Sequence, residues 1–137
     1  MATPQPLEKT IARRISRRKA NVFLRSDFED LGGYDQVGRA LRCLVRKGQL
    51  MKVGYGLYTR AKLSPFTGEP APRVGIKRLA EEALCRLKVE TGPTRMEQEY
   101  NSGKSTQIPT GRVVGVKKRV RRKIVVGMVK VRFERVR

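Results

Sequence analysis

The sequence predicts an α+β protein, in which helices and strands occupy separate stretches of the chain. Three observations support this fold class. Apolar residues recur with a helical period in three stretches, apolar and charged residues alternate near the C-terminus, and glycine and proline residues separate these stretches. The changes of pattern predict a domain over residues 1–60, an irregular linker over 61–72 and a module over 73–137.

The most informative stretch is the helix predicted over residues 34–47. One face carries the apolar side chains of a core-packed helix: Val37, Ala40, Leu41, Leu44 and Val45. The other face presents Arg39, Arg42 and Arg46, and no acidic residue lies between positions 39 and 46. Because the major groove of DNA is wide enough to admit a helix, this is the candidate recognition helix.

A short helix should come just before it. Ser26 and Glu29 have the spacing of a capping box, and the helix that they open would bury Phe28 and Leu31. Gly32-Gly33 then predicts a sharp turn.

A hairpin should follow the candidate recognition helix. Gly48 stands where a helix ends, and the apolar segments 49–53 and 57–60 flank Gly54-Tyr55-Gly56. Helix, tight turn, helix and hairpin is the order of a winged helix-turn-helix, in which the hairpin is the wing.

Two further elements are predicted upstream. Leu7, Ile11 and Ile15 recur every four residues, which predicts a helix over 7–18, and Val22–Leu24 is expected to form a strand that pairs with the wing. The first six residues, with prolines at positions 4 and 6, are expected to be a frayed leader.

Residues 7–60 resemble the winged helix-turn-helix at the N-terminus of AbiEi-type antitoxins, the regulatory halves of type IV toxin-antitoxin systems. The residues that carry the resemblance are Leu41, Leu44, Val45, Gly48, Leu50 and Gly56-Leu57-Tyr58. Residues 100–109, with the valine-rich strand after them, resemble the C-terminal module of short AbiEi-like proteins. The resemblance implies a repressor of its own operon that accompanies a nucleotidyltransferase-like toxin.

The C-terminal module is predicted to contain helices and a small sheet. A helix over 76–89 ends at Thr91-Gly92-Pro93, and Thr94 with Glu97 forms a capping box that opens a short helix to about Tyr100. Period-two patterns predict a three-stranded antiparallel sheet with one basic face, built from the strands 113–116, 124–126 and 129–133.

The net charge indicates a polyanionic partner. The chain has 137 residues and 32 Lys and Arg against 12 Asp and Glu, which gives +20. Residues 1–60 carry 13 basic and 5 acidic residues and residues 111–137 carry 11 and 1, so both ends are cationic. Nucleic acid fits better than a membrane, because no stretch approaches the ~20 apolar residues of a spanning helix and no signal-peptide pattern is present.

Cysteine and histidine usage argues against metal sites and catalysis. Cys43 and Cys85 are isolated thiols, and the chain has no histidine. A structural zinc site and a histidine general base are therefore excluded, and we expect a cytoplasmic protein without enzymatic activity or a cofactor. Gly103-Lys104-Ser105 lacks the first glycine of a phosphate-binding loop, since Gln98 stands there.

These observations predict a sequence-specific transcriptional repressor that binds double-stranded DNA. Tyr34, Gln36 and Arg39 should face base edges. The residues expected on phosphates are Arg42, Arg46, Lys47, Lys52, Tyr55, Arg17 and Arg18. A second basic patch is predicted at Lys117, Lys118, Arg119, Arg121, Arg122 and Lys123.

Two other functions stay open. The pI near 11.1 also fits an RNA-binding or ribosome-associated protein. The chain could instead act mainly by binding a protein partner through residues 61–137, as an antitoxin binds its toxin. Whether the protein forms a homodimer on DNA is also open.

Overall fold

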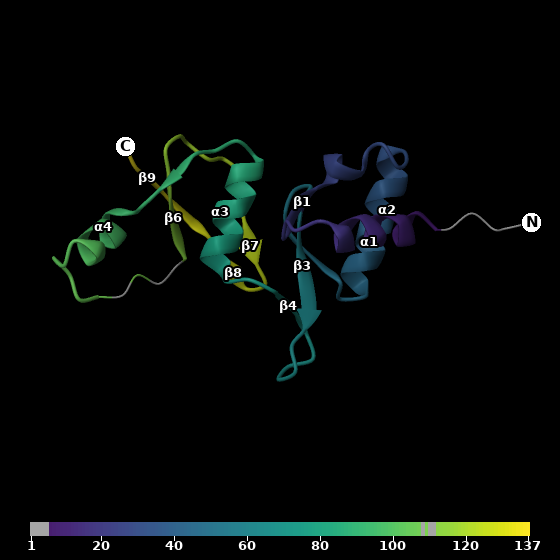
Figure 1. The fold of residues 1–137 in the computed structure, drawn as a ribbon, viewed down its shortest axis with the longest axis horizontal. Helices are drawn as coiled ribbons and strands as arrows, with labels where there is room; N and C mark the ends of the chain where they lie inside the picture. The colour runs from purple at the N-terminus through teal and green to yellow at the C-terminus, as the bar shows by residue number, and fades with distance from the viewer. Residues whose placement is uncertain (1–5, 108, 110–111) are drawn as a thin grey trace, which may run out of the picture. The chain divides into compact units, whose positions relative to one another are not determined.

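The structure, a computed structural model, describes residues 6–107, 109 and 112–137 of an α+β chain (Figure 1). Its contacts divide the chain into two compact units, which are described separately below. The N-terminal unit comprises residues 1–52 and 56–73, and the C-terminal unit comprises 53–55 and 74–137. Residues 1–5, which are nearly all of the predicted leader, lie outside the described residues. So does Ile108, which belongs to the segment 100–109 that resembles AbiEi-like proteins.

The N-terminal unit contains both helices and strands. In chain order they are α1 (Leu7–Arg17), β1 (Val22–Leu24), a short 3-10 helix η1 (Arg25–Phe28), α2 (Tyr34–Arg46), β2 (Leu50–Gly54), β3 (Leu57–Leu63) and β4 (Pro70–Pro72). The last two residues of β2, Val53 and Gly54, are grouped with the C-terminal unit. The predicted helices over 7–18 and 34–47 and the strand over 22–24 are confirmed within one residue at each end.

One hydrophobic core joins α1 and α2 to the strands. Ile11 of α1, Leu41 of α2 and Phe28 of η1 are fully buried in it. The other buried members are Ile15, Phe23, Val37, Ala40, Leu44, Leu50 and Tyr58. Burying a leucine or phenylalanine side chain contributes about 1.5–3 kcal/mol, so this core fixes the apolar face of α2 and leaves the opposite face to solvent.

The strands of this unit form a sheet in the order β1-β3-β2, with β4 also paired to β3. Phe23 lies opposite Tyr58, which confirms that the strand at 22–24 pairs with the hairpin. Ala61 lies opposite Pro72, so residues 61–72 are not an irregular linker as predicted. Proline has no N–H to donate to a neighbouring strand, so it argues against a central strand. Among the described strands β4 pairs only with β3, which makes it an edge strand, and proline is tolerated there.

The end of α2 follows the prediction for Gly48. Gly48 has φ +76°, a left-handed conformation that glycine adopts without strain. Its N–H donates to the Val45 carbonyl and the Gln49 N–H donates to the Leu44 carbonyl, both at 3.0 Å. This is a Schellman motif, which satisfies carbonyls at the helix end and turns the chain into β2.

The short helix before α2 differs from the prediction. Ser26 and Glu29 do not form the expected capping box. The Asp27 carboxylate instead accepts the Leu24 N–H at 2.9 Å, and a 3-10 helix begins at Arg25. An aspartate three residues after Leu24 reaches this donor, so the helix starts two residues earlier than the Ser–Glu spacing suggests.

The C-terminal unit contains two helices and several short strands. They are α3 (Ile76–Arg86), β5 (Thr91–Gly92), α4 (Arg95–Asn101), β6 (Val113–Val116), β7 (Val125–Val126), β8 (Val129–Lys130) and β9 (Arg132–Arg135). The buried side of α3 carries Leu79, Ala80, Ala83 and Leu84, and the helix contacts β5 and β6.

The predicted three-stranded antiparallel sheet is wrong in its pairing. β6 is the central strand, and it pairs antiparallel with β5 and parallel with β9. β7 and β8 form a separate two-stranded hairpin. Strand patterning does not identify partners, and the 15 residues between β6 and β9 are long enough for the crossover that a parallel pair needs.

Both ends of α4 are set by residues close to them in the sequence. Thr94 Oγ1 accepts the Glu97 N–H and Glu97 accepts the Thr94 N–H, both at 3.1 Å, which confirms the capping box at the start of α4. α4 ends at Asn101, and Gly103, two residues later, has φ +80°. Lys104 N–H donates to the Glu99 carbonyl, so Gly103-Lys104-Ser105 belongs to a helix end and not to a phosphate-binding loop.

Candidate nucleic-acid interface

The exposed face of α2 carries the three predicted arginines together. Arg39, Arg42 and Arg46 are exposed and lie three, four and seven positions apart, which places them on one side of a helix over about 10 Å. Within the described part of the chain none of them pairs with a carboxylate. The buried residues on the opposite side of α2 hold this cationic face in place.

Arg25 fixes the start of α2, a role that sequence reasoning missed. Its guanidinium lies 3.4 Å from the ring centre of Tyr34 and donates to the Tyr34 carbonyl. The backbone N–H of Arg25 donates to the carbonyl of Gly56, in the turn between β2 and β3, at 2.9 Å. Gly38 makes room for this side chain, because a Cβ there would lie 2.3 Å from an Arg25 nitrogen. One arginine therefore connects η1, α2 and the hairpin.

The residues predicted to face bases lie near the start of α2. Tyr34 is 63% exposed, and Gln36 and Arg39 are exposed. The side-chain oxygen of Gln36 accepts the Gly33 N–H at 3.2 Å, so part of this amide serves the helix start. Asp35, which the sequence reasoning passed over, is exposed four residues before Arg39 on the same side. A carboxylate there can accept from cytosine N4.

Two predicted phosphate contacts on α2 have partners within the protein. Lys47 forms an ion pair with Glu8 of α1, which joins the two helices and partly neutralises the lysine. Arg46 donates to the Cys43 sulfur at 3.3 Å. Cys43 itself is half-buried.

The remaining predicted phosphate contacts are all exposed. Arg17 and Arg18 end α1, Lys52 lies on β2, and the side chain of Tyr55 is 76% exposed in the β2–β3 turn. The Tyr55 carbonyl accepts a hydrogen bond from Arg122 at 2.9 Å.

Arg14 is a structural cation, although it looks like its exposed neighbours in the sequence. Its two terminal nitrogens donate to the two oxygens of Asp30 at 2.7 and 2.8 Å. A third contact, to the Asp27 carbonyl, measures 2.9 Å. The Arg14 hydrogen bonds hold the pKa of Asp30 below its ordinary value, while desolvation acts in the opposite direction.

Arg60 is a second structural cation. Its Nε donates to the Ala20 carbonyl at 2.9 Å, and a terminal nitrogen donates to the carbonyls of Ile15 and Arg18. Its guanidinium carbon lies 5.5 Å from the ring centre of Phe23. Arg60 thus ties the end of α1 to β3. A lone arginine in a strand pattern gives no sequence signal for this role.

The second basic patch lies in the irregular connection between β6 and β7. All six of its predicted residues are exposed. Lys117 forms a 3.4 Å ion pair with Glu90, and Arg122 makes the contact to Tyr55 described above. The patch is therefore a charged loop.

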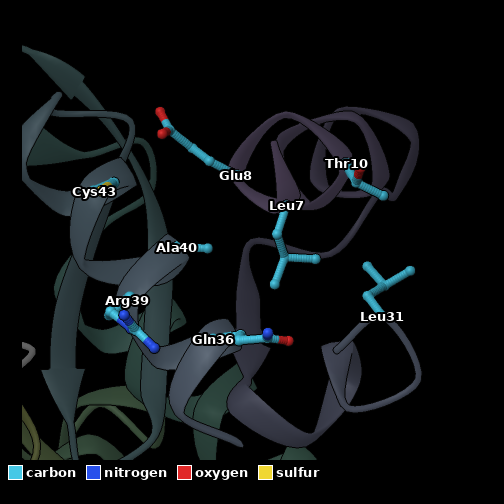
Figure 2. Close-up of a pocket in the computed structure, with 8 residues that line it drawn as sticks. All are labelled: Leu7, Glu8, Thr10, Leu31, Gln36, Arg39, Ala40 and Cys43. Carbon is cyan, nitrogen blue, oxygen red and sulfur yellow. The ribbon is translucent and has the colours of Figure 1, made fainter. Parts of the chain in front are cut away.

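A groove opens beside α2 on the side that faces α1. It has a volume of about 680 Å³ and is lined by Leu7, Glu8, Thr10, Leu31, Gln36, Arg39, Ala40 and Cys43 (Figure 2). Figure 2 shows Leu7 reaching from α1 toward the α2 residues Gln36 and Ala40. Leu31, predicted to be buried with Phe28, is half-buried at this groove. Arg39 and Gln36 therefore stand at the edge of a hollow and not on a flat surface.

Neither a metal site nor a membrane span emerges from the described residues. No group of three or more His, Cys, Asp or Glu side chains gathers where it could hold a metal ion. No described helix is long and apolar enough to cross a membrane.

Comparison with known proteins gives a family without an assigned function. The chain matches no curated protein and no solved structure. Residues 9–137 match the family described as a family of unknown function, DUF6088. Since that match spans both units, the chain belongs to the DUF6088 family.

Proposed function

We propose that the N-terminal unit is a winged helix-turn-helix that binds double-stranded DNA and represses transcription. The observation that carries this proposal is the row of Arg39, Arg42 and Arg46, exposed on α2 while the other side of α2 is buried. A rigid helix with cations on one side suits the negatively charged major groove.

The order and pairing of the elements support the same proposal. η1, the turn at Gly32-Gly33 and α2 follow one another as the helices of a helix-turn-helix do. β2 and β3 come directly after α2, and β1 pairs with β3 on the other side. The Arg25 N–H of η1 donates to the Gly56 carbonyl in the turn between β2 and β3, which supports the assignment of this hairpin as the wing.

The proposed roles follow the position of each residue along α2. Arg39, with Tyr34 and Gln36, reads base edges near the start of the helix. Arg42 and Arg46 contact phosphates, and Arg17, Arg18, Lys52 and Tyr55 extend these contacts. Lys47 contributes less than these residues, because Glu8 already neutralises part of its charge.

The biological role that we propose is autoregulation. The resemblance to AbiEi-type antitoxins favours a repressor of its own operon, paired with a nucleotidyltransferase-like toxin, and a cytoplasmic site of action. A homodimer on a palindromic operator would double the contact surface. Co-purification of the full chain with the product of an adjacent gene tests the toxin partner.

Fluorescence anisotropy with the full chain tests DNA binding. The probe is a labelled duplex from upstream of the gene, and the competitors are random duplex, single-stranded DNA and structured RNA. We expect the upstream duplex to bind best, and about six phosphate contacts give a log–log salt slope near −5. Preference for RNA would instead favour the RNA-binding alternative.

Variants of α2 separate base reading from phosphate contact. Arg39→Ala should cost about 1–3 kcal/mol on the upstream duplex and reduce its advantage over random duplex. Arg42→Ala should weaken binding to both duplexes by the same factor. It should also make the log–log slope of affinity against salt concentration shallower by about one. The control is Arg78→Ala, which removes an exposed arginine from α3. Equal effects of Arg39→Ala and Arg78→Ala would refute the assignment of α2.

A further inference from the structure

A second groove in the N-terminal unit shares only Lys47 with the proposed DNA contacts. It has a volume of about 430 Å³ and lies between α1, the residues just after α2, and β3. This volume is in the range of small-ligand sites. Tyr34, Gln36 and Arg39 do not line it, so its occupation does not require the surface proposed to read bases.

The groove is lined by four basic side chains and by no acidic one. They are Lys47, Arg60, Lys62 and Arg73, of which Lys47 is already paired with Glu8. Lys62 and Arg73 are exposed, and neither pairs with a carboxylate within the described residues. Cations gathered around a hollow raise the local positive potential and offer charge-assisted hydrogen bonds, which favours an anion.

The rest of the groove is apolar and well supported. Ile15 and Ala61 are buried, and Ala12 is half-buried beside them. Leu63 also lines the groove, and its side chain is 57% exposed. Arg60 is held by its hydrogen bonds to the end of α1, so this cation is already oriented. An apolar surface beside fixed cations suits a ligand with an anionic end and an apolar body.

We propose that this groove binds a small organic phosphate monoester. Lys62 and Arg73 contact the phosphate, with Lys47 beside them, and Ala12, Ala61 and Leu63 contact the apolar body. The proposal does not depend on DNA binding, and its test is independent of DNA.

The first test locates the site by NMR. The ¹⁵N-labelled full chain is titrated with phenyl phosphate, and separately with inorganic phosphate, at constant ionic strength. We expect saturable shifts of the groove amides, at residues 12–16, 47–49, 60–63 and 73. Phenyl phosphate should bind about tenfold more tightly than inorganic phosphate, because the ring buries apolar surface. Shifts spread over all the basic surfaces, or equal affinities for the two probes, would overturn the proposal.

The second test uses matched variants. The double variant Lys62→Ala, Arg73→Ala should bind phenyl phosphate about tenfold more weakly, because it loses two charge-assisted contacts. The control Lys9→Ala, Lys19→Ala removes the same charge from exposed positions outside the groove and should bind as the wild type does. Equal weakening of the two variants would show attraction by net charge alone and overturn the site. Both pairs are exposed, so the fold should survive, and the wild-type titration decides the location by itself.

Discussion

Replacing Arg60 with methionine tests whether this side chain holds the end of α1 against β3. Methionine keeps much of the length and the apolar stem but has no donor. The carbonyls of Ile15, Arg18 and Ala20 then lose the guanidinium that they share. The contacts to Ile15 and Ala20 are partly buried, whereas the one to Arg18 is exposed.

The expected magnitude follows from these contacts. A hydrogen bond from a charged donor contributes about 1.5–3 kcal/mol when it is buried and less when water can replace it. Two partly buried contacts and one exposed contact therefore predict a loss of about 2–4 kcal/mol, after allowing for partial solvation. That is a large part of the free energy of unfolding of a typical domain, which is about 5–15 kcal/mol.

Amide hydrogen exchange is the suitable assay, because two units need not unfold in one step. The measured quantity is the opening free energy of α1 and β3 amides in the N-terminal unit. Lys62→Met is the control, since Lys62 lies two residues further along β3 and is exposed. An Arg60→Met loss no larger than that of Lys62→Met would refute the role assigned to Arg60.

Three further predictions concern stability. Lys88 has φ +62° in the Schellman motif that ends α3, so Lys88→Gly should stabilise the C-terminal unit by about 1 kcal/mol in urea denaturation, and Lys88→Ala should give no gain. A Cβ at Gly115 would lie 2.2 Å from the Gly92 carbonyl oxygen of β5, so Gly115→Ala should destabilise the C-terminal unit by about 2–4 kcal/mol. The control Gly75→Ala has open space around it and should destabilise the unit by less than about 1 kcal/mol. Similar losses for the two variants would contradict the close approach of β5 and β6. Because Arg14 lowers the pKa of Asp30, the Asp30 contribution to stability is complete above the ordinary value of 3.8 and is lost as the pH falls through the lowered pKa. Asp30→Asn should therefore narrow the difference between urea midpoints at about pH 6 and about pH 3, and an unchanged difference would contradict the linkage.

The sequence by itself determined the features that depend on neighbouring residues. The apolar period of α2, the glycine at its end and the Thr94–Glu97 cap are local patterns, and the structure confirms all three. Backbone hydrogen bonds and side-chain direction in a helix are set within four or five residues. The arginine row on α2 was predictable for the same reason.

The partners of strands and charges were decided only by the tertiary structure. β4 pairs with β3, and β9 pairs in parallel with β6. The local sequence pattern of each strand does not indicate which strand it pairs with. In the sequence, Arg14, Arg60 and Arg42 are all arginines in amphipathic segments. The fold brings Asp30 to the first and the carbonyl groups near the end of α1 to the second, and leaves the third facing solvent. Long-range packing therefore separates the cations that hold the protein together from those available to a partner.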